Sequence, residues 1–201
     1  MFKQSLISAL LLTGISGSAL AAGLDYDTLD IGFQRYELDQ DGDNFDVDGL
    51  NLQGSLKLTQ DFFLRGGIED VDGSDGPFRL DARTYSVGLG VRAPINNALD
   101  FNAYADYLYT DTDYKVRGVY SDSDNDSGYR VGGGLRGLAT SDLELAGFVN
   151  YEDYGHGDDS TWLDGRAVYS LTPSVGLYGG YGVNLDESDL DRWSAGVRVS
   201  F

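Results

Sequence analysis

Few residues of this sequence have the types and spacing that catalysis requires. His156 is the only histidine, and with Asp153, Asp158 or Asp159 it could form a His-Asp pair that activates water. The chain has no cysteine and no G-x-S-x-G motif, so it lacks both a thiol and the usual serine-hydrolase nucleophile. Glycines flank His156 on both sides, which is typical of a solvent-exposed loop. The sequence therefore predicts neither an enzyme nor a bound cofactor.

Clustered carboxylates raise the question of a metal site. Asp39, Asp41 and Asp43 have the odd-position spacing that opens an EF-hand loop. The sixth position of that loop would be Asn44 instead of glycine, and the twelfth would be Leu50 instead of glutamate. No metal ligands are therefore assigned. Loose binding of divalent cations by this and other acidic stretches stays open as an alternative.

The elements that position these side chains are predicted to be β-strands. Apolar or small residues occupy every second position in ten stretches, a period that gives a strand one apolar and one polar face. Each stretch has close to the roughly 9–11 residues that a tilted strand needs to cross a bilayer. The stretches are residues 28–38, 49–58, 62–71, 83–93, 99–110, 129–139, 143–153, 162–171, 175–184 and 192–201.

The segments between these stretches alternate in length. Spacers 39–46, 72–81 and 112–127 are long and 155–160 and 185–189 are moderate, whereas 59–61, 94–98, 140–142 and 172–174 are short. Outer-membrane barrels have this layout, with short turns on one side and longer loops on the other. We predict an all-β transmembrane up-and-down antiparallel barrel of about ten strands, with eight strands as the alternative. A soluble β-sandwich explains the alternation but not the spacer rhythm.

The N-terminal stretch has the features of an export signal. Lys3 precedes an apolar run that ends in Ala19-Leu20-Ala21, a small-x-small cleavage site. Residues 1–21 are therefore predicted to be a signal peptide, and residues 22–201 a single outer-membrane β-barrel domain. Because the exported chain has no cysteine, its stability must come from packing and from backbone closure.

Aromatic residues near the strand ends predict two interfacial girdles. Tyr107, Tyr109, Tyr129, Tyr151, Trp162 and Trp193 lie toward the long spacers, and Phe62, Phe101 and Phe201 lie toward the short ones. With the signal peptide and the terminal "VRVSF", the chain resembles the small outer-membrane β-barrel proteins of Gram-negative bacteria, and its strand rhythm is most similar to the xanthomonad Ax-type branch. The resemblance implies that the barrel-assembly machinery reads a terminal signal, here Trp193, Val197, Val199 and Phe201.

The residues between the apolar positions are predicted to face the lumen. They are Lys57, Arg65, Glu69, Arg92, Asp100, Asp106, Arg130, Arg136, Glu144, Glu152, Asp164, Arg166, Arg192 and Arg198, together with Asp30. Their charges nearly balance, which favours a lattice of ion pairs that braces the wall. A narrow polar channel is the alternative, because glycines of the same parity would leave space and Arg92, Arg136 and Arg198 could form a positive ring. These glycines are residues 32, 67, 88, 90, 132, 134, 180, 182 and 196.

The function predicted from these features is that of a porin-like outer-membrane barrel. Its lumen would be narrow or nearly occluded, for limited passage of small solutes and for roles at the envelope surface. The alternative is a surface adhesion or recognition protein that acts through acidic extracellular loops. The expected partners are outer-membrane lipid and lipopolysaccharide, with both termini periplasmic. The net charge of −19 excludes a nucleic-acid binder, which needs clustered cations.

Overall fold

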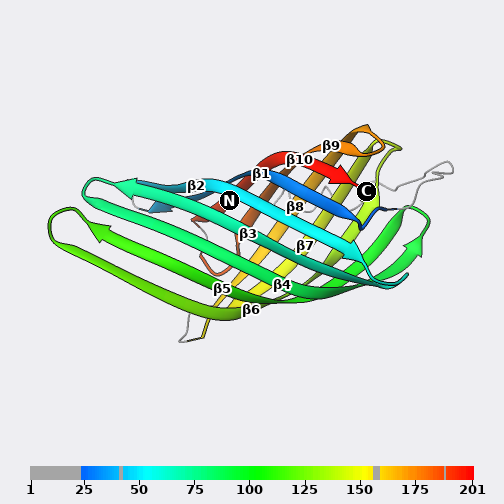
Figure 1. Cartoon of the computed structure of the whole chain (residues 1–201). Coiled ribbons are helices and arrows are strands. Elements are labelled where there is room, and N and C mark those ends of the chain that lie inside the picture. Colours follow the sequence, from blue (N-terminus) through cyan, green and yellow to red (C-terminus); the bar gives the residue numbers. More distant parts are fainter. Residues whose placement is uncertain (1–23, 41–42, 156–158, 188) are drawn as a thin grey trace.

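A closed antiparallel barrel is the architecture of the described chain, which comprises residues 24–40, 43–155, 159–187 and 189–201 of a computed structural model. Within these residues ten strands follow one another around the barrel, and the first pairs with the last from Thr28↔Ser200 to Leu38↔Leu190 (Figure 1). The strands are β1 (Thr28–Gln40), β2 (Asp43–Lys57), β3 (Phe62–Asp75), β4 (Phe78–Asn96), β5 (Leu99–Val116), β6 (Tyr120–Leu138), β7 (Leu143–Asp153), β8 (Asp159–Thr172), β9 (Val175–Asn184) and β10 (Leu190–Ser200). The predicted ten-strand barrel is confirmed.

Both ends of the described chain lie at the end of the barrel that carries the short turns. The backbone N–H of Phe201 donates to the carbonyl of Asp27, 3.0 Å away, beside the closing strand pair. The predicted signal peptide and cleavage site lie outside the described residues. No helix in the described ranges is long and apolar enough to span a membrane.

Three of the four short turns share one hydrogen-bond pattern. The Thr59 hydroxyl accepts from the backbone N–H groups two and three residues further on, and the Thr140 and Thr172 hydroxyls do the same. The fourth turn uses the Asn96 side-chain oxygen, which accepts from the backbone N–H of Ala98. A short polar side chain at the start of each turn thus satisfies backbone donors that the ladder leaves unpaired.

The long spacers are mostly strand, which corrects the expectation that they are loops. β3 and β4 stay paired as far as Asp75↔Phe78, and β5 and β6 stay paired as far as Val116↔Tyr120. The reversals are tight because Gly76 and Gly118 adopt φ values of 56° and 78°, in the left-handed region that glycine enters without strain. Continued pairing also provides hydrogen-bond partners for the backbone N–H and C=O groups of these polar segments. The alternation of apolar residues does not reveal this pairing.

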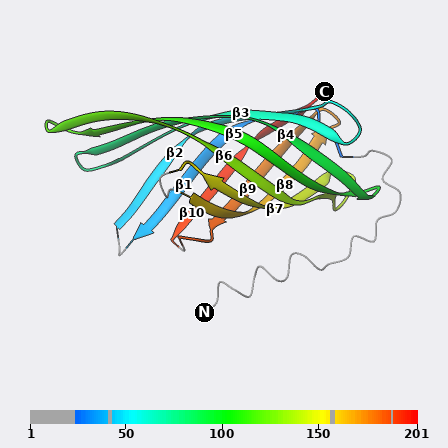
Figure 2. The same cartoon turned by 90° about the horizontal axis from the view of Figure 1, so that it is seen from below.

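These prolonged hairpins form a sheet that projects beyond the barrel. We call residues 35–40, 43–48, 70–83 and 110–128 of β1 to β6 and their turns the extension. It reaches well past the ends of β7 to β10, so that one side of the barrel mouth is tall and the other is short (Figures 1 and 2).

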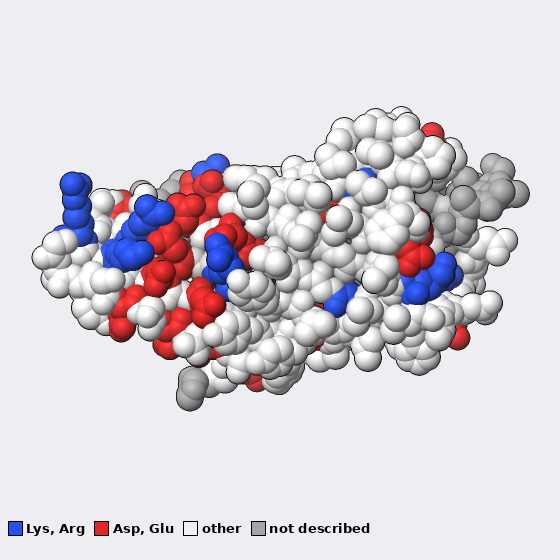
Figure 3. Space-filling model, viewed as in Figure 1, with Lys and Arg blue, Asp and Glu red and all other residues white. Residues whose placement is uncertain are grey.

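A row of aromatic pairs marks where the extension begins on the outer face. Tyr85 and Tyr109 have ring centroids 6.4 Å apart, and the corresponding separation for Tyr181 and Trp193 is 4.4 Å. A further pair, Tyr129 and Tyr151, completes the row. On the barrel side of this row the outer wall carries exposed apolar side chains such as Leu89. On the other side charged side chains gather on the extension, at the left in Figure 3.

Trp162 does not belong to this outer row, contrary to the prediction. Its side chain is only 4% exposed, and its ring lies inside the barrel 4.2 Å from the guanidinium carbon of Arg192. The neighbouring Leu163 carries the outward parity of β8, so position 162 faces inward. Proximity to a strand end suggested a girdle residue, but parity decides the face.

Candidate functional site

The barrel interior is a lattice of arginines paired with carboxylates. Seven inward arginines lie within ion-pair distance of an aspartate or glutamate on another strand. The pairs are Arg65–Asp106, Arg92–Asp100, Arg130–Glu152, Arg136–Glu144, Arg166–Asp30, Arg192–Asp164 and Arg198–Asp30. Since both members of each pair are removed from bulk water, each charge depends on its partner.

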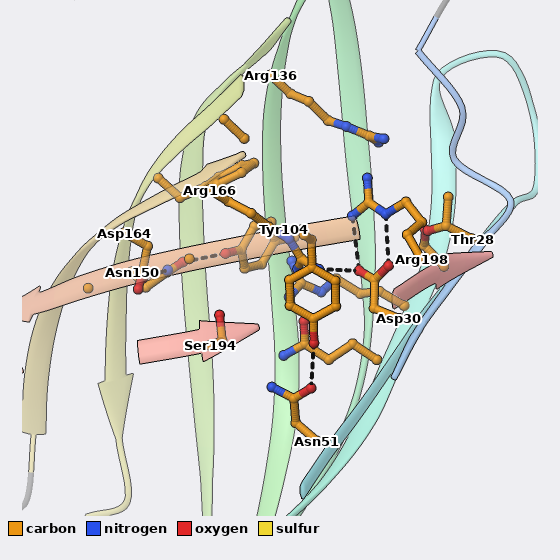
Figure 4. Close-up of a pocket in the computed structure, with 18 of the residues that line it drawn as sticks. Thr28, Asp30, Asn51, Tyr104, Arg136, Asn150, Asp164, Arg166, Ser194 and Arg198 are labelled. Atoms are coloured by element: carbon orange, nitrogen blue, oxygen red, sulfur yellow. Dashed lines mark hydrogen bonds and ion pairs between the residues drawn. The ribbon is translucent and has the colours of Figure 1, made fainter. Parts of the chain in front are cut away.

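Asp30 lies on β1, the first strand, beside the last strand β10 with which it closes the barrel. It accepts two hydrogen bonds from Arg198 on β10, at 2.7 and 2.9 Å, and one from Arg166 on β8 at 2.7 Å (Figure 4). Its side chain is almost fully buried. Arg198 also donates to Glu144 at 3.1 Å, which links this group to β7. One carboxylate therefore ties three strands together across the lumen.

A second group occupies the interior nearer the mouth. Arg192 donates to both carboxylate oxygens of Asp164, at 2.8 and 2.6 Å, and lies 3.7 Å from Glu152. Asn150 donates to the same Asp164 at 2.6 Å. Glu69 accepts from the Tyr36 hydroxyl at 2.7 Å. The bidentate Arg192–Asp164 pair and the hydrogen bonds from the Asn150 amide and the Tyr36 hydroxyl hold these side chains in fixed positions.

Tyr26 closes the short-turn end of the lumen. It lies just before β1, is 2% exposed, and donates to Asp100 or Asn102 at 2.9 and 2.8 Å. The guanidinium carbons of Arg92 and Arg136 lie 4.9 and 4.7 Å from its ring centroid, a cation-π distance. With Leu24, Phe63 and Leu138 it forms an apolar cluster.

This cluster corrects the expected positive ring at the short-turn end. Arg92 is paired with Asp100 at 3.1 Å, and Arg136 donates to Glu144 at 2.7 and 2.8 Å. Arg198 is held by Asp30. Each of the three arginines is therefore neutralised by a carboxylate on a neighbouring strand, which agrees with the ion-pair lattice that the balance of inward charges favours.

The inward glycines face bulky neighbours, so the space that their parity predicted is partly occupied. A Cβ built at Gly32 would lie within 2.1 Å of the Tyr178 hydroxyl, and one at Gly90 would meet the Phe63 ring at the same distance. A Cβ at Gly132 would meet Asn150 and Tyr104. The missing side chains therefore make room for aromatic rings of nearby strands, which lie over the glycines and occupy part of the lumen.

The remaining space is a small polar cavity of about 240 Å³. This volume lies below the roughly 300–1,000 Å³ typical of small-molecule sites. The lining residues that Figure 4 labels are Thr28, Asp30, Asn51, Tyr104, Arg136, Asn150, Asp164, Arg166, Ser194 and Arg198. The cavity has room for a few water molecules among polar partners. Tyr26 and Phe63, whose ring centroids are 5.1 Å apart, are among its aromatic lining residues.

Some predicted residues lie apart from the lattice. Lys57 has inward parity but is exposed at the last position of β2, beyond the paired region of the lumen. Trp193, Val197 and Phe201 are exposed on the outer wall, and Val199 is half-buried there. His156, Asp158 and Asp41 lie outside the described residues. In the part that is described, no group of three or more acidic or histidine side chains is arranged to hold a metal ion.

Sequence reasoning missed the neutral members of the interior. Tyr26 lies before the first alternating stretch, so the pattern did not include it. Tyr178 carries inward parity on β9 and donates to Asn51 at 2.8 Å, and Arg166 stacks on its ring at 3.9 Å. The available signal was a tyrosine at an inward position opposite Gly32 and Gly196, since a large side chain needs a small one facing it.

On the extension the inner face changes character. Register carries the lumen-facing parity from Glu69 through Thr84 and Thr110 to Asp126, with no shift along the way. The Thr84 and Thr110 hydroxyls are 2.9 Å apart. Farther from the barrel this face carries apolar side chains on β1 to β4, with Asp75 at the tip of β3, and three aspartates on β6. The apolar residues are Leu38, Phe45, Val47, Val71, Phe78, Leu80 and Ala82, and the β6 aspartates are Asp122, Asp124 and Asp126.

The outer face of the extension carries neutralised charges instead. Arg83 on β4 pairs with Asp70 on β3, and Lys115 on β5 lies 3.5 Å from Asp81 on β4, so these two pairs join neighbouring strands. Arg79 donates to Asp81 on the same strand at 3.0 Å. These groups are well exposed, and each pair contributes little to stability because water screens it.

Comparisons with known proteins agree with this architecture. A family model described as "Outer membrane protein beta-barrel domain" matches residues 7–169. Comparison with curated proteins gave no match. The fold is similar to the transport unit of the autotransporter AIDA-I from Escherichia coli, with 12% identity, 94% of each chain covered and a TM-score of 0.55. It is also similar to the translocator domain of NalP from Neisseria meningitidis, with 10% identity, 90% of each chain covered and a TM-score of 0.53.

Proposed function

The chain belongs to the outer membrane protein β-barrel family, a family of the bacterial outer membrane, and from this premise we propose that it acts in recognition at the cell surface. In this proposal the barrel holds the protein in the membrane without conducting solutes, and the extension binds the partner. Limited solute passage, which the sequence favoured, takes second place. The observation that carries this order is the lumen, where paired arginines and carboxylates and the Tyr26 ring leave only a small polar cavity.

We further propose that the extension faces the outside of the cell and the short turns face the periplasm. The support is the outer surface, where an apolar wall ends at the Tyr85 and Tyr109 row and charged side chains begin beyond it. The cell-surface side of an outer-membrane barrel carries its longer connections. Lipid and lipopolysaccharide would then surround the wall below that row. The finer likeness to the xanthomonad Ax-type branch rests on strand rhythm and stays part of this proposal.

Current measurement in planar bilayers tests the closed anchor. Wild-type barrel is expected to give no open-channel steps, and Arg136→Ala is expected to give none while its denaturant midpoint falls, because Glu144 loses its bidentate partner. Steady current through the wild type, altered in ion preference by Arg136→Ala, would overturn the proposal and restore the channel.

Epitope tags test the orientation. A tag inserted near Asp124, on the extension, is expected to be labelled on intact cells. A tag near Ser141, in the short turn between β6 and β7, is expected to be labelled only after permeabilisation. Labelling with the opposite pattern would overturn the proposed sidedness.

The second candidate, limited passage, keeps one supporting observation. The polar cavity of about 240 Å³ is wide enough for water, and a motion of Tyr26 would connect it to the short-turn end. Tyr26→Ala separates the two candidates, because a barrel that conducts only after this change has a passage that the ring blocks.

A further inference from the structure

The inner face of the extension is a sheet face whose β1 to β4 half is apolar except for Asp75 at the tip of β3, and whose β6 side is acidic. Along one rung, Val47, Gly73, Leu80, Tyr114 and Asp122 follow one another across β2 to β6. The next rung toward the barrel runs from Val71 to Asp124 in the same way. Every pair of strands in extensive contact is a hydrogen-bonded pair, so no second layer covers this face within the described part of the chain.

The apolar half is a contiguous strip. Val47 and Val71 are buried by their neighbours, and the rings of Phe45 and Phe78 lie 6.0 Å apart. Gly73 lies between them, where a Cβ would meet Val47 and Phe45. Leu38, Phe45, Phe78 and Leu80 are half-buried, so each still presents part of its apolar surface on this face. An apolar surface rimmed by charge is typical of a site that binds a partner.

The acidic half lacks the neutralisation seen on the outer face. Asp122, Asp124 and Asp126 are exposed, and no lysine or arginine of the described chain lies within ion-pair distance of them. Outward aspartates of the same hairpins, such as Asp70 and Asp81, have arginine partners. The inner row therefore offers its charge to a cation from outside the molecule.

From this arrangement we propose that the inner face of the extension binds a cationic amphipathic helix of a partner polypeptide. The apolar strip on β2 to β4 would receive the apolar side of the helix, and the β6 aspartates would receive its lysines or arginines. Three strand spacings separate β3 from β6, about 14 Å, which matches the roughly 10–12 Å diameter of a helix with its side chains. This proposal deepens the proposed surface recognition and rests on it.

Charge also excludes a second copy of this chain as the occupant. Two inner faces in contact would bring the β6 aspartates of one molecule toward those of the other, and the whole chain carries a net charge of −19. Like charges at a contact oppose association, whereas a cationic helix satisfies both halves of the face at once.

The test uses full-length barrel in nanodiscs of zwitterionic lipid, with empty nanodiscs as the baseline for lipid binding. The probe is a fluorescent synthetic helix of lysine and leucine, and its affinity is read by anisotropy. Replacing Asp122, Asp124 and Asp126 together by asparagine is expected to weaken binding about tenfold, which corresponds to about 1.4 kcal/mol. The matched control replaces Asp72, Asp111 and Asp113, on the outer face of the same hairpins, and is expected to change affinity less than twofold.

Two further arms test the apolar half. A probe with leucine replaced by serine at equal charge is expected to lose binding, and Thr112→Lys, a half-buried polar position between the two halves, is expected to weaken the original probe. Equal loss in the control triple variant, or undiminished binding of the serine probe, would overturn the proposal as mere charge attraction. Circular dichroism that shows added strand instead of helix would also overturn it. None of these outcomes affects the current or labelling tests above.

Discussion

The barrel and the extension are two parts of one continuous sheet with opposite polarity. In the barrel, the outer face is apolar at residues such as Leu89 and the inner face carries pairs such as Asp30–Arg198. In the extension, the outer face carries pairs such as Asp70–Arg83, and the inner face carries Val71 and Leu80. The strands and their register run through the boundary without a break. The outer face is therefore apolar along the barrel and charged along the extension, while successive side chains point to opposite faces in both regions.

The two sets of ion pairs differ in what they contribute. Within the barrel, charges are largely removed from bulk water, and a lost partner leaves a charge that the few waters of a small cavity solvate poorly. On the extension, water reaches both partners and screens them. The same arginine-carboxylate pairs thus stabilise the fold in the barrel, whereas on the extension they contribute little to stability and mainly keep the surface polar.

The largest effect is expected for insertion into the outer membrane when the C-terminal residue Phe201 is removed. Deletion of Phe201, which is 68% exposed there, should leave most of the protein in the periplasm and sensitive to protease, if the terminal strand is read during assembly. Shortening the extension by removing residues 111–126 should leave insertion intact. Fractionation and heat-modifiable migration measure both. Full insertion without Phe201 would show that the signal lies elsewhere.

The next largest effect separates buried from exposed pairs. Asp30→Ala removes the partner of Arg166 and Arg198 and should lower the free energy of unfolding by about 3–5 kcal/mol. Asp70→Ala, which frees the exposed Arg83, should leave the urea midpoint unchanged within error. Equal shifts for the two variants would break the distinction between the regions.

A smaller effect tests the outer faces. Leu89→Arg places a charge midway along the apolar wall of β4 and should cost about 2–4 kcal/mol of stability in lipid vesicles. Ser123→Arg places the same side chain on the exposed outer face of β6 and should have no measurable cost. Comparable losses would mean that the aromatic row does not mark the lipid boundary.

The smallest effect is a titration on the extension. A hydrogen bond from Arg79 lowers the pKa of Asp81 below its ordinary value of 3.8. The carboxylate therefore adds stability above that pH, and the contribution disappears as pH falls through the lowered pKa. Arg79→Gln should return the pKa of Asp81 toward 3.8, as measured by NMR. An unchanged pKa would mean that the pair does not form in solution.

Much of the barrel could be predicted because period-two alternation reports the pleat directly. Leu50, Leu52 and Leu56 on β2, for example, mark an apolar outer face whichever neighbours pair with it. The ends of the strands could not be predicted in this way. Between residues 72 and 81 the polarity of the two faces exchanges, so an apolar-out pattern ends there although the hydrogen-bond ladder continues to Asp75↔Phe78.

The interior was predictable residue by residue but not as an assembly. Parity identifies Arg136 and Glu144 as inward, yet it does not say that they meet or that Tyr26 lies over the arginine. Those contacts depend on the register between neighbouring strands and on the segment before β1, which alternation alone does not give. Trp162 and the inward glycines were misjudged for the same reason, since a position on a strand was considered without what faces it.

The Asp30–Arg198 pair has a consequence for how the barrel reaches its final state. Its members are 168 positions apart in the chain, and β1 meets β10 only when the cylinder closes. Until that moment Asp30 and Arg198 have no partner in each other, so a nearly closed barrel gains none of this bond. Contacts between such distant positions slow folding, because the chain must be ordered before they form. The stabilisation that this pair provides is therefore available only to the complete ring.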